Sequence, residues 1–201
     1  MKKNENPTSK GRWKLLLILL VCAAPMIFSY LAYYVIKPGG RTNYGVILDP
    51  RDYPVPALNA RLLSTHSTDK TTGLDAYKGK WLMLSIDGGD CHPACRKKLY
   101  DIRQLRLAQG KEMERIERVW LISDEQPVDT DLIRQHDGMQ MLRVNAEIVK
   151  RWLPTEADTQ ISDHIYMVDP LGNLMMRFPK DADPNKMKKD IAKLLKASSI
   201  G

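Results

Sequence analysis

The sequence predicts an α/β domain, a mixed sheet flanked by helices, that follows one N-terminal transmembrane helix. Three observations carry this prediction: a long uncharged apolar run near the N-terminus, strand patterns that alternate with helical patterns, and a late β-hairpin signal. Strand, helix and strand in series imply a parallel pair joined by a right-handed crossover, and the hairpin adds antiparallel strands. We expect helices on both faces of such a sheet.

The apolar run covers residues 15–36, LLLILLVCAAPMIFSYLAYYVI, and contains no charged residue. At about 1.5 Å per residue, a helix of this length spans roughly 33 Å, enough for a hydrocarbon core of about 30 Å. A cleaved signal peptide is the alternative, but VCA before Ala24 is a poor cleavage site and the apolar run continues beyond it. Cys22, inside the run, is then a passive apolar residue.

The charges around this run predict its orientation. Basic residues gather in residues 1–14, which the positive-inside rule keeps in the cytoplasm. The C-terminal part then projects outward, into the periplasm for a bacterial inner membrane or the intermembrane space for a mitochondrion. Residues 37–56 are rich in proline and glycine and are expected to form a linker, with the domain over residues 57–201. Of the net charge of +7, little remains for the domain, too weak and dispersed for nucleic-acid binding.

Residue patterns place the elements of the domain. Continuous apolar runs predict buried strands at residues 81–86 and 118–123. Pro93 suits the first turn of a helix with apolar residues at helical spacing, and Gly110 fits its C-terminal cap. The remaining expected elements are a polar helix that begins at Asp129 or Thr130, a short helix AEIVKRWL, a hairpin around Asp169–Asn173, and a helix capped by Asp183.

Cys91 and Cys95 form the one cysteine pair outside the apolar run, at the predicted start of a helix. Because they are four residues apart, they share a helical face; Cys95 is expected to point inward and Cys91 to lie at an exposed tip. A helix N-terminus lowers the pKa of a thiol. Three interpretations stay open: thiolates that bind a soft ion such as Cu(I), a reversible disulfide, and a structural disulfide.

A metal site needs a third member, and His164 is the candidate. It opens the first strand of the predicted hairpin, and the end of that strand can approach the loop that carries Cys91. Asp124 and Asp163 are candidate hydrogen-bond acceptors for such a site, with turn or cap roles as the alternative. Three histidines are expected to be exposed: His66, His92 and His136. Four methionines are interpreted as core residues rather than thioether ligands: Met139, Met141, Met175 and Met176.

Together these segments resemble the Sco/SenC family, thioredoxin-like copper chaperones of cytochrome c oxidase assembly. YKGKWLMLSIDGGDCHPAC resembles the strand, loop and CxxxC of the family, which follow a membrane anchor and a linker. VWLISDEQPVDT resembles its second strand and acidic loop, and SDHIYMVDPLGNLMMRF resembles its Asp-His, strand, turn and strand. The resemblance spans roughly residues 57–197 and implies a thioredoxin-like fold.

The resemblance implies that Cys91, Cys95 and His164 bind copper, as Cu(I) or Cu(II). It also implies a role in assembling the oxidase copper centre, with cytochrome c oxidase subunit II or another oxidase assembly factor as partner. One alternative is a thiol–disulfide oxidoreductase in which Cys91 and Cys95 are the catalytic redox pair, Cys91 attacking and Cys95 resolving. Another is a metal-free thioredoxin-like assembly factor.

The sequence departs from the family pattern at the cysteines and at the histidine. The family usually has proline directly after each cysteine, where this chain has His92 and Arg96. The family histidine usually lies several residues before the strand tyrosine, whereas only Ile165 separates His164 from Tyr166.

Overall fold

Two compact units make up the chain, Met1–Thr42 and Asn43–Gly201. The computed structural model describes residues 9–32, 34, 43–63, 71–198 and 200. The first unit contains helix α1, Ser9–Leu31, within which Arg12–Leu31 is long and apolar enough to cross a membrane, with a mean hydropathy of 2.2. No part of that window is buried against protein, as expected for a helix that faces lipid.

The second unit is built on a mixed sheet whose strand order, among the described residues, is β1-β8-β7-β4-β5-β6-β2-β3. The central β4 is parallel to β5, and β5 to β6, whereas β7 pairs antiparallel with both β4 and β8. The strands are β1 (Val46–Ile47), β2 (Ala60–Leu62), β3 (Thr71–Thr72), β4 (Trp81–Asp87), β5 (Ile116–Ile122), β6 (Gln140–Arg143), β7 (Ile165–Val168) and β8 (Leu174–Arg177). The predicted α/β fold with a mixed sheet is confirmed.

Four α-helices of the described residues accompany the sheet: α2 (Pro93–Leu107), α3 (Thr130–Gln135), α4 (Ala146–Trp152) and α5 (Pro184–Ala197). Short 3₁₀ turns lie at η2 (Leu74–Tyr77), η3 (Gly110–Arg115) and η4 (Ile161–Asp163). Asp129 and Asp183 cap α3 and α5 by accepting a backbone N–H two residues on. Gly110 does not cap α2, which ends at Leu107; it opens η3 in the left-handed region instead.

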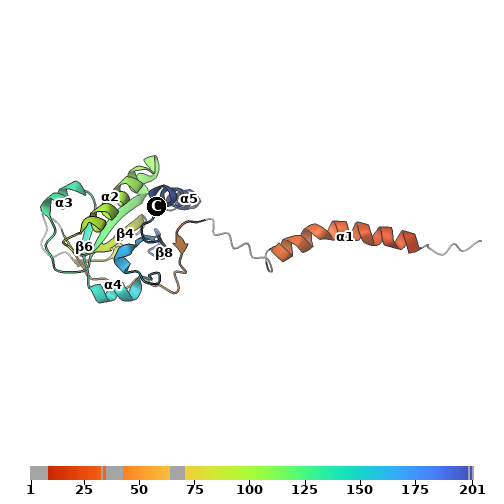
Figure 1. Ribbon diagram of the computed structural model, residues 1–201, viewed down its shortest axis with the longest axis horizontal. Coiled ribbons are helices and arrows are strands. Elements are labelled where there is room, and N and C mark those ends of the chain that lie inside the picture. The colour runs from red at the N-terminus through yellow and green to blue at the C-terminus, as the bar shows by residue number, and fades with distance from the viewer. Residues whose placement is uncertain (1–8, 33, 35–42, 64–70, 199, 201) are drawn as a thin grey trace, which may run out of the picture. The chain divides into compact units, whose positions relative to one another are not determined.

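The sheet separates two hydrophobic cores, with α2 and α5 on one face and α4 on the other (Figure 1). Successive side chains of a strand point to opposite faces, so β4 directs Trp81 and Met83 to the α2 side and Leu82 and Leu84 to the α4 side. A strand covered on both faces is apolar throughout, which explains the unbroken apolar run from which β4 was predicted. We call these two cores the α2-face core and the α4-face core.

The domain begins at Asn43, earlier than the residue 57 expected from composition. The backbone N–H groups of Tyr44 and Gly45 donate to the buried carboxylate of Asp190 at 2.6 and 2.9 Å. Val46 and Ile47 then pair with β8, and the Trp152 indole donates to the Tyr53 carbonyl at 3.3 Å. This segment packs against the domain although it is rich in proline. Its contacts are made by the residues that lie between the prolines. Residues 37–42 of the predicted linker lie outside the described residues.

Candidate functional site

Cys91 and Cys95 form a disulfide, and their Cα atoms are 5.1 Å apart. Each residue is only 1% exposed and belongs to the α2-face core. Cys95 points inward as predicted, but the prediction that Cys91 is exposed is wrong. His92 is the residue that caps α2, and Cys91 precedes the helix with a left-handed φ of 39°. That backbone conformation, unusual for a residue with a Cβ, accompanies the burial of Cys91 beside the first turn of α2.

The loop from β4 to α2 is held against the loop that follows β5. The Gly89 N–H donates to the Asp124 carboxylate at 2.8 Å, and the same oxygen accepts from Gln126 N–H at 3.2 Å. A Cβ on Gly89 would lie 2.1 Å from the backbone oxygen of Gln126, so this approach requires glycine. The Cys91 N–H donates to the Gly88 carbonyl at 3.3 Å and closes the turn before the disulfide.

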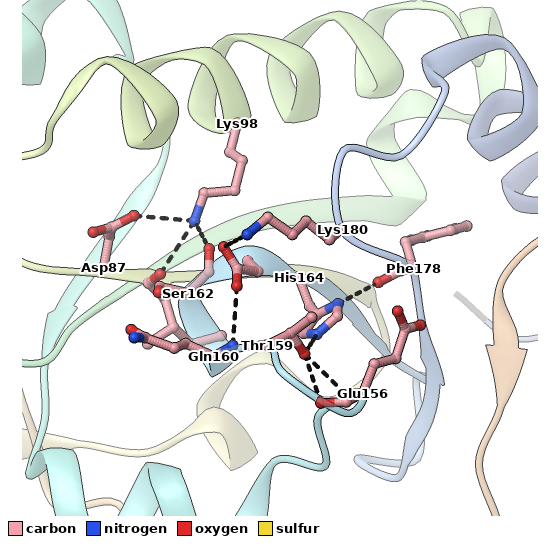
Figure 2. A network of polar contacts seen from close by, with 11 residues as sticks. Asp87, Lys98, Glu156, Thr159, Gln160, Ser162, His164, Phe178 and Lys180 are labelled. Carbon is pink, nitrogen blue, oxygen red and sulfur yellow. Dashed lines mark hydrogen bonds and ion pairs between the residues drawn. The ribbon is translucent and has the colours of Figure 1, made fainter.

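Arg96 and Lys98 tie this loop to its surroundings from α2. The Arg96 Nε donates to the Cys91 carbonyl at 3.2 Å, and its Nη2 contacts the Asp129 carboxylate at 3.1 Å. Lys98 Nζ lies 3.0 Å from the Asp87 carboxylate and also donates to the Ser162 carbonyl, as Figure 2 shows. The N-terminus of a helix favours negative charge and is a setting that lowers the pKa of a thiol, whereas Arg96 and Lys98 are each paired with a carboxylate.

His164 is fully buried, and both of its ring nitrogens have protein partners (Figure 2). Nδ1 lies 2.9 Å from the Phe178 carbonyl, which only accepts, so Nδ1 carries the proton. Nε2 lies 2.8 Å from the Thr159 hydroxyl, whose single proton also has the Glu156 carbonyl as an acceptor at 2.9 Å. Burial lowers the pKa of His164, and the bond to Phe178 only partly opposes this effect. The imidazole is therefore neutral at pH 7, with a defined tautomer.

The structure brings Cys91 and Cys95 together but does not bring His164 to them. Ile165 of β7 lies in the α2-face core with the disulfide, whereas Tyr166 lies in the α4-face core. His164 has an extended backbone and its ring stacks edge-on with Tyr166 at 6.0 Å, so it shares the Tyr166 side of the sheet. Among the described residues, no three His, Cys, Asp or Glu side chains are grouped to hold a metal ion.

These residues do not fit a copper ion in the conformation described. Both sulfurs are joined in the disulfide, and the Nε2 lone pair of His164 is directed at Thr159. A three-coordinate site needs two thiolates and a free imidazole nitrogen. The predicted ligand set of Cys91, Cys95 and His164 therefore stays a prediction.

The other candidate side chains have structural roles. His92 is exposed, as expected, and pairs with Asp90 at 3.1 Å. Asp124 holds the β4–α2 loop, and Asp163 accepts from the Gln160 N–H at 3.0 Å in a capping box, so both take the turn and cap roles given as the alternative. Met139, Met141 and Met176 are buried in the α2-face core and Met175 packs against it. His66 lies outside the described residues.

His136 was expected to be exposed, and this is wrong: it is 5% exposed at the end of α3. Its Nδ1 has no hydrogen-bond partner among the described residues. Burial lowers the pKa of His136, and the nearby Arg118 and Arg103 guanidinium groups lower it further. The polar sequence around His136 concealed this burial, because Arg118 and Arg103 come from β5 and α2.

Sequence reasoning also missed the contacts of Thr159 and Arg96. Thr159 lies in a loop, and nothing in its sequence context indicates that its hydroxyl would meet His164. Arg96 carried a signal, since it stands where the resembled family has proline, but that position does not reveal which groups a guanidinium would bind.

A thioredoxin-like domain with a cysteine pair at a strand–helix junction, preceded by an apolar helix, defines a class of membrane-associated thioredoxin-like proteins. Two family models match the chain accordingly. The transmembrane-like, thioredoxin-like C-terminal domain matches residues 81–198, and the transmembrane-like N-terminal domain matches residues 6–35. The first match alone covers more than half of the sequence. The chain therefore belongs to this family of transmembrane-like proteins with a thioredoxin-like C-terminal domain.

Solved structures share the fold at low identity. ScoI of Arabidopsis thaliana with copper bound is 16% identical, with 71% of this chain and 100% of that chain covered and a TM-score of 0.53. Yeast Sco1 with copper bound is also 16% identical, with 71% and 91% covered and a TM-score of 0.52. No curated protein sequence matches significantly. The resemblance to Sco proteins is thus confirmed at the level of the thioredoxin-like fold.

Replacing Gly89 by alanine should lower the free energy of unfolding by about 1–3 kcal/mol, because its Cβ collides with a backbone oxygen that a side-chain rotation cannot move. Gly88→Ala is the comparison, since its Cβ would meet a side-chain oxygen of Asp124 at 2.5 Å rather than a backbone oxygen. Urea unfolding followed by tryptophan fluorescence measures both. Equal losses in the two variants would contradict the close approach of the two loops.

Acidification should destabilise the domain partly through His136. Its pKa in the folded state lies below the ordinary histidine value of 6.5, so the unfolded chain takes up the proton first as the pH falls. The stabilisation is complete above the unfolded pKa and is lost progressively below it. We expect the free energy of unfolding to fall less between pH 7.5 and pH 5.5 in His136→Gln than in the wild type. An unchanged slope in His136→Gln refutes the assignment.

Proposed function

We propose that this protein is a membrane-anchored, extracytoplasmic thioredoxin-like protein whose Cys91 and Cys95 alternate between a disulfide and a dithiol. The observation that carries the proposal is the disulfide itself, at the junction of the central strand β4 and the N-terminus of α2. A cross-link between residues four apart closes a very small loop and adds little by chain entropy. A position at the N-terminus of a helix favours the thiolate form of a reduced cysteine, which suits a pair that exchanges disulfides.

Thiol–disulfide exchange with a partner dithiol needs no further oxidant or reductant. A thiolate of a partner dithiol attacks one sulfur, breaks the Cys91–Cys95 bond and forms a mixed disulfide. The second partner thiol then displaces the protein sulfur, so two electrons and two protons pass from the partner to Cys91 and Cys95. In the reverse direction Cys91 attacks and Cys95 resolves. Both sulfurs are buried, so exchange requires the loop of residues 88–92 to open; the Gly89–Asp124 and Arg96–Cys91 hydrogen bonds oppose this opening.

The membrane topology is part of the proposal. The basic residues 1–14 stay in the cytoplasm, α1 crosses a bacterial inner membrane, and the domain lies in the periplasm. That compartment permits disulfides, and its oxidising conditions suit the oxidised pair of the structure.

A redox titration of the full chain in detergent tests the proposal. In a Cys22→Ser background, the protein is equilibrated with thiol buffers of graded potential and its free thiols are alkylated and counted by mass spectrometry. We expect Cys91 and Cys95 to become alkylated together in one two-electron transition above about −300 mV. A pair that stays oxidised below that potential is a structural cross-link, which would leave the metal-free assembly factor as the remaining interpretation.

Copper binding is the second candidate function, and one observation in the site favours it. The Nδ1–H of His164 donates to a backbone carbonyl, which leaves Nε2 unprotonated, as in many histidines that bind metals. The solved Sco structures of the same fold, from Arabidopsis thaliana and yeast, hold copper. Reduction of the disulfide and a rearrangement before β7 are required first. In its finer form this candidate delivers copper to cytochrome c oxidase, through subunit II or another assembly factor.

Titration of the reduced full chain with Cu(I) against a competing chelator tests this second candidate. We expect Cys91→Ser to weaken binding at least tenfold, and His164→Asn to weaken it also if the imidazole is a ligand. His92→Gln is the control, because it removes an exposed imidazole between the two cysteines. Affinity that survives Cys91→Ser and His164→Asn would exclude the three-ligand site.

A further inference from the structure

The charges of the domain are segregated in space although they nearly cancel in sum. Residues 43–201 contain 24 Lys and Arg against 23 Asp and Glu. α2 and α5 alone hold ten of these cations and two of the carboxylates, one of which is the buried Asp190. The rest of residues 43–201 therefore holds 14 cations against 21 carboxylates. The charges appeared dispersed along the sequence, but the fold brings the cations of α2 and α5 together on one face.

α2 and α5 pack against each other on the same face of the sheet (Figure 1). We call their outer surfaces, taken together, the basic face. It presents eight exposed cations: Arg96, Lys97, Arg103, Lys186, Lys188, Lys189, Lys193 and Lys196. Lys188, Lys189 and Lys196 form no ion pair with any residue that the structure describes. The carboxylates nearby include Asp101, Glu112 and Glu114, which pair with Lys97, Arg115 and Arg106. Asp163 and Asp181 also lie at this face, in a hollow that Lys97, Lys98 and Lys180 line with them.

A groove of about 600 Å³ lies within the basic face, between α5 and the segment that runs from the end of α2 through η3. Four cations line it, Lys111, Arg115, Lys188 and Lys196, against the single carboxylate of Glu112. Its remaining lining includes the apolar Leu195 and Ala192. An excess of cations beside apolar surface complements a headgroup that bears a phosphate next to its acyl chains.

The short stretch of chain between α1 and the domain favours the membrane as the anionic partner of the basic face. Twelve Cα–Cα steps separate Leu31, the end of α1, from Asn43, the start of the domain. At no more than about 3.6 Å per step, they span at most roughly 43 Å whatever their conformation. The domain therefore remains within about that distance of the membrane, where weak attractions act at a high effective concentration.

We propose that the basic face docks onto anionic phospholipid headgroups of the membrane that α1 enters. The proposal rests on the membrane anchor of the proposed function but not on its redox chemistry. Several lysines, each attracted weakly to an anionic surface, hold a tethered domain there and release it when salt screens the attraction. An acidic protein surface is the rival partner, and the experiment separates the two.

The test uses the full chain in nanodiscs of phosphatidylcholine, with or without about one-third phosphatidylglycerol. Lysine acylation rates are measured by mass spectrometry. We expect Lys186, Lys193 and Lys196 to react at least threefold more slowly in the anionic discs, and to regain the faster rate in 0.5 M NaCl. Lys150, on α4 of the opposite face, should react at one rate in both.

Two matched double variants complete the design. Lys188→Glu with Lys189→Glu should abolish the protection, whereas Lys150→Glu with Arg151→Glu on α4 makes the same charge change and should retain it. Equal rates in the two lipid compositions would overturn the proposal, and protection that appears only in native membranes would assign the face to a protein partner. Failure of the chain to enter nanodiscs refutes the anchor, and docking with it, while the redox titration in detergent stands independently.

Discussion

The alternation of side chains along β7 is the constraint on which the chemistry of this domain depends. β7 is hydrogen-bonded on both sides, to β4 and to β8, and buried on both faces. Ile165 therefore fills the core beneath the disulfide, and His164 faces the other core. Rotating a side chain cannot exchange the two faces, because a shift of one residue would move every side chain of the strand to the wrong core. Any state in which His164 meets the cysteines needs a different backbone before β7.

The departures from the Sco/SenC pattern have local physical reasons. Proline after the second cysteine would offer no side-chain donor, whereas Arg96 holds the Cys91 carbonyl and the cap of α3 together. Gly89, before Cys91, admits the backbone of the neighbouring loop at a distance that excludes a Cβ. This loop therefore packs closely against its neighbour beside the disulfide.

The elements that could be predicted are those whose sequence pattern lies within a few neighbouring residues. β4 and β5 are long apolar runs, and α3 and α5 begin at acidic caps, so strand, helix and order follow from neighbouring residues. β1, β2 and β3 have only two or three residues each and carry no periodic pattern. The burial of Cys91 depends on one left-handed residue, and that of His136 on arginines distant in the sequence. Such features arise from tertiary contacts that no short segment encodes.

The Asp190 carboxylate, which binds the backbone of Tyr44 and Gly45, also determines how the domain bears mechanical load. Any pull from a moving membrane or partner enters through the polypeptide just before Asn43. Asp190 meets that pull first, and the two residue pairs between β1 and the edge strand β8 come next. Tension would peel this short entry segment while the central strands and the disulfide stay intact. The segment that enters the domain would therefore detach under load before the cysteine pair is disturbed.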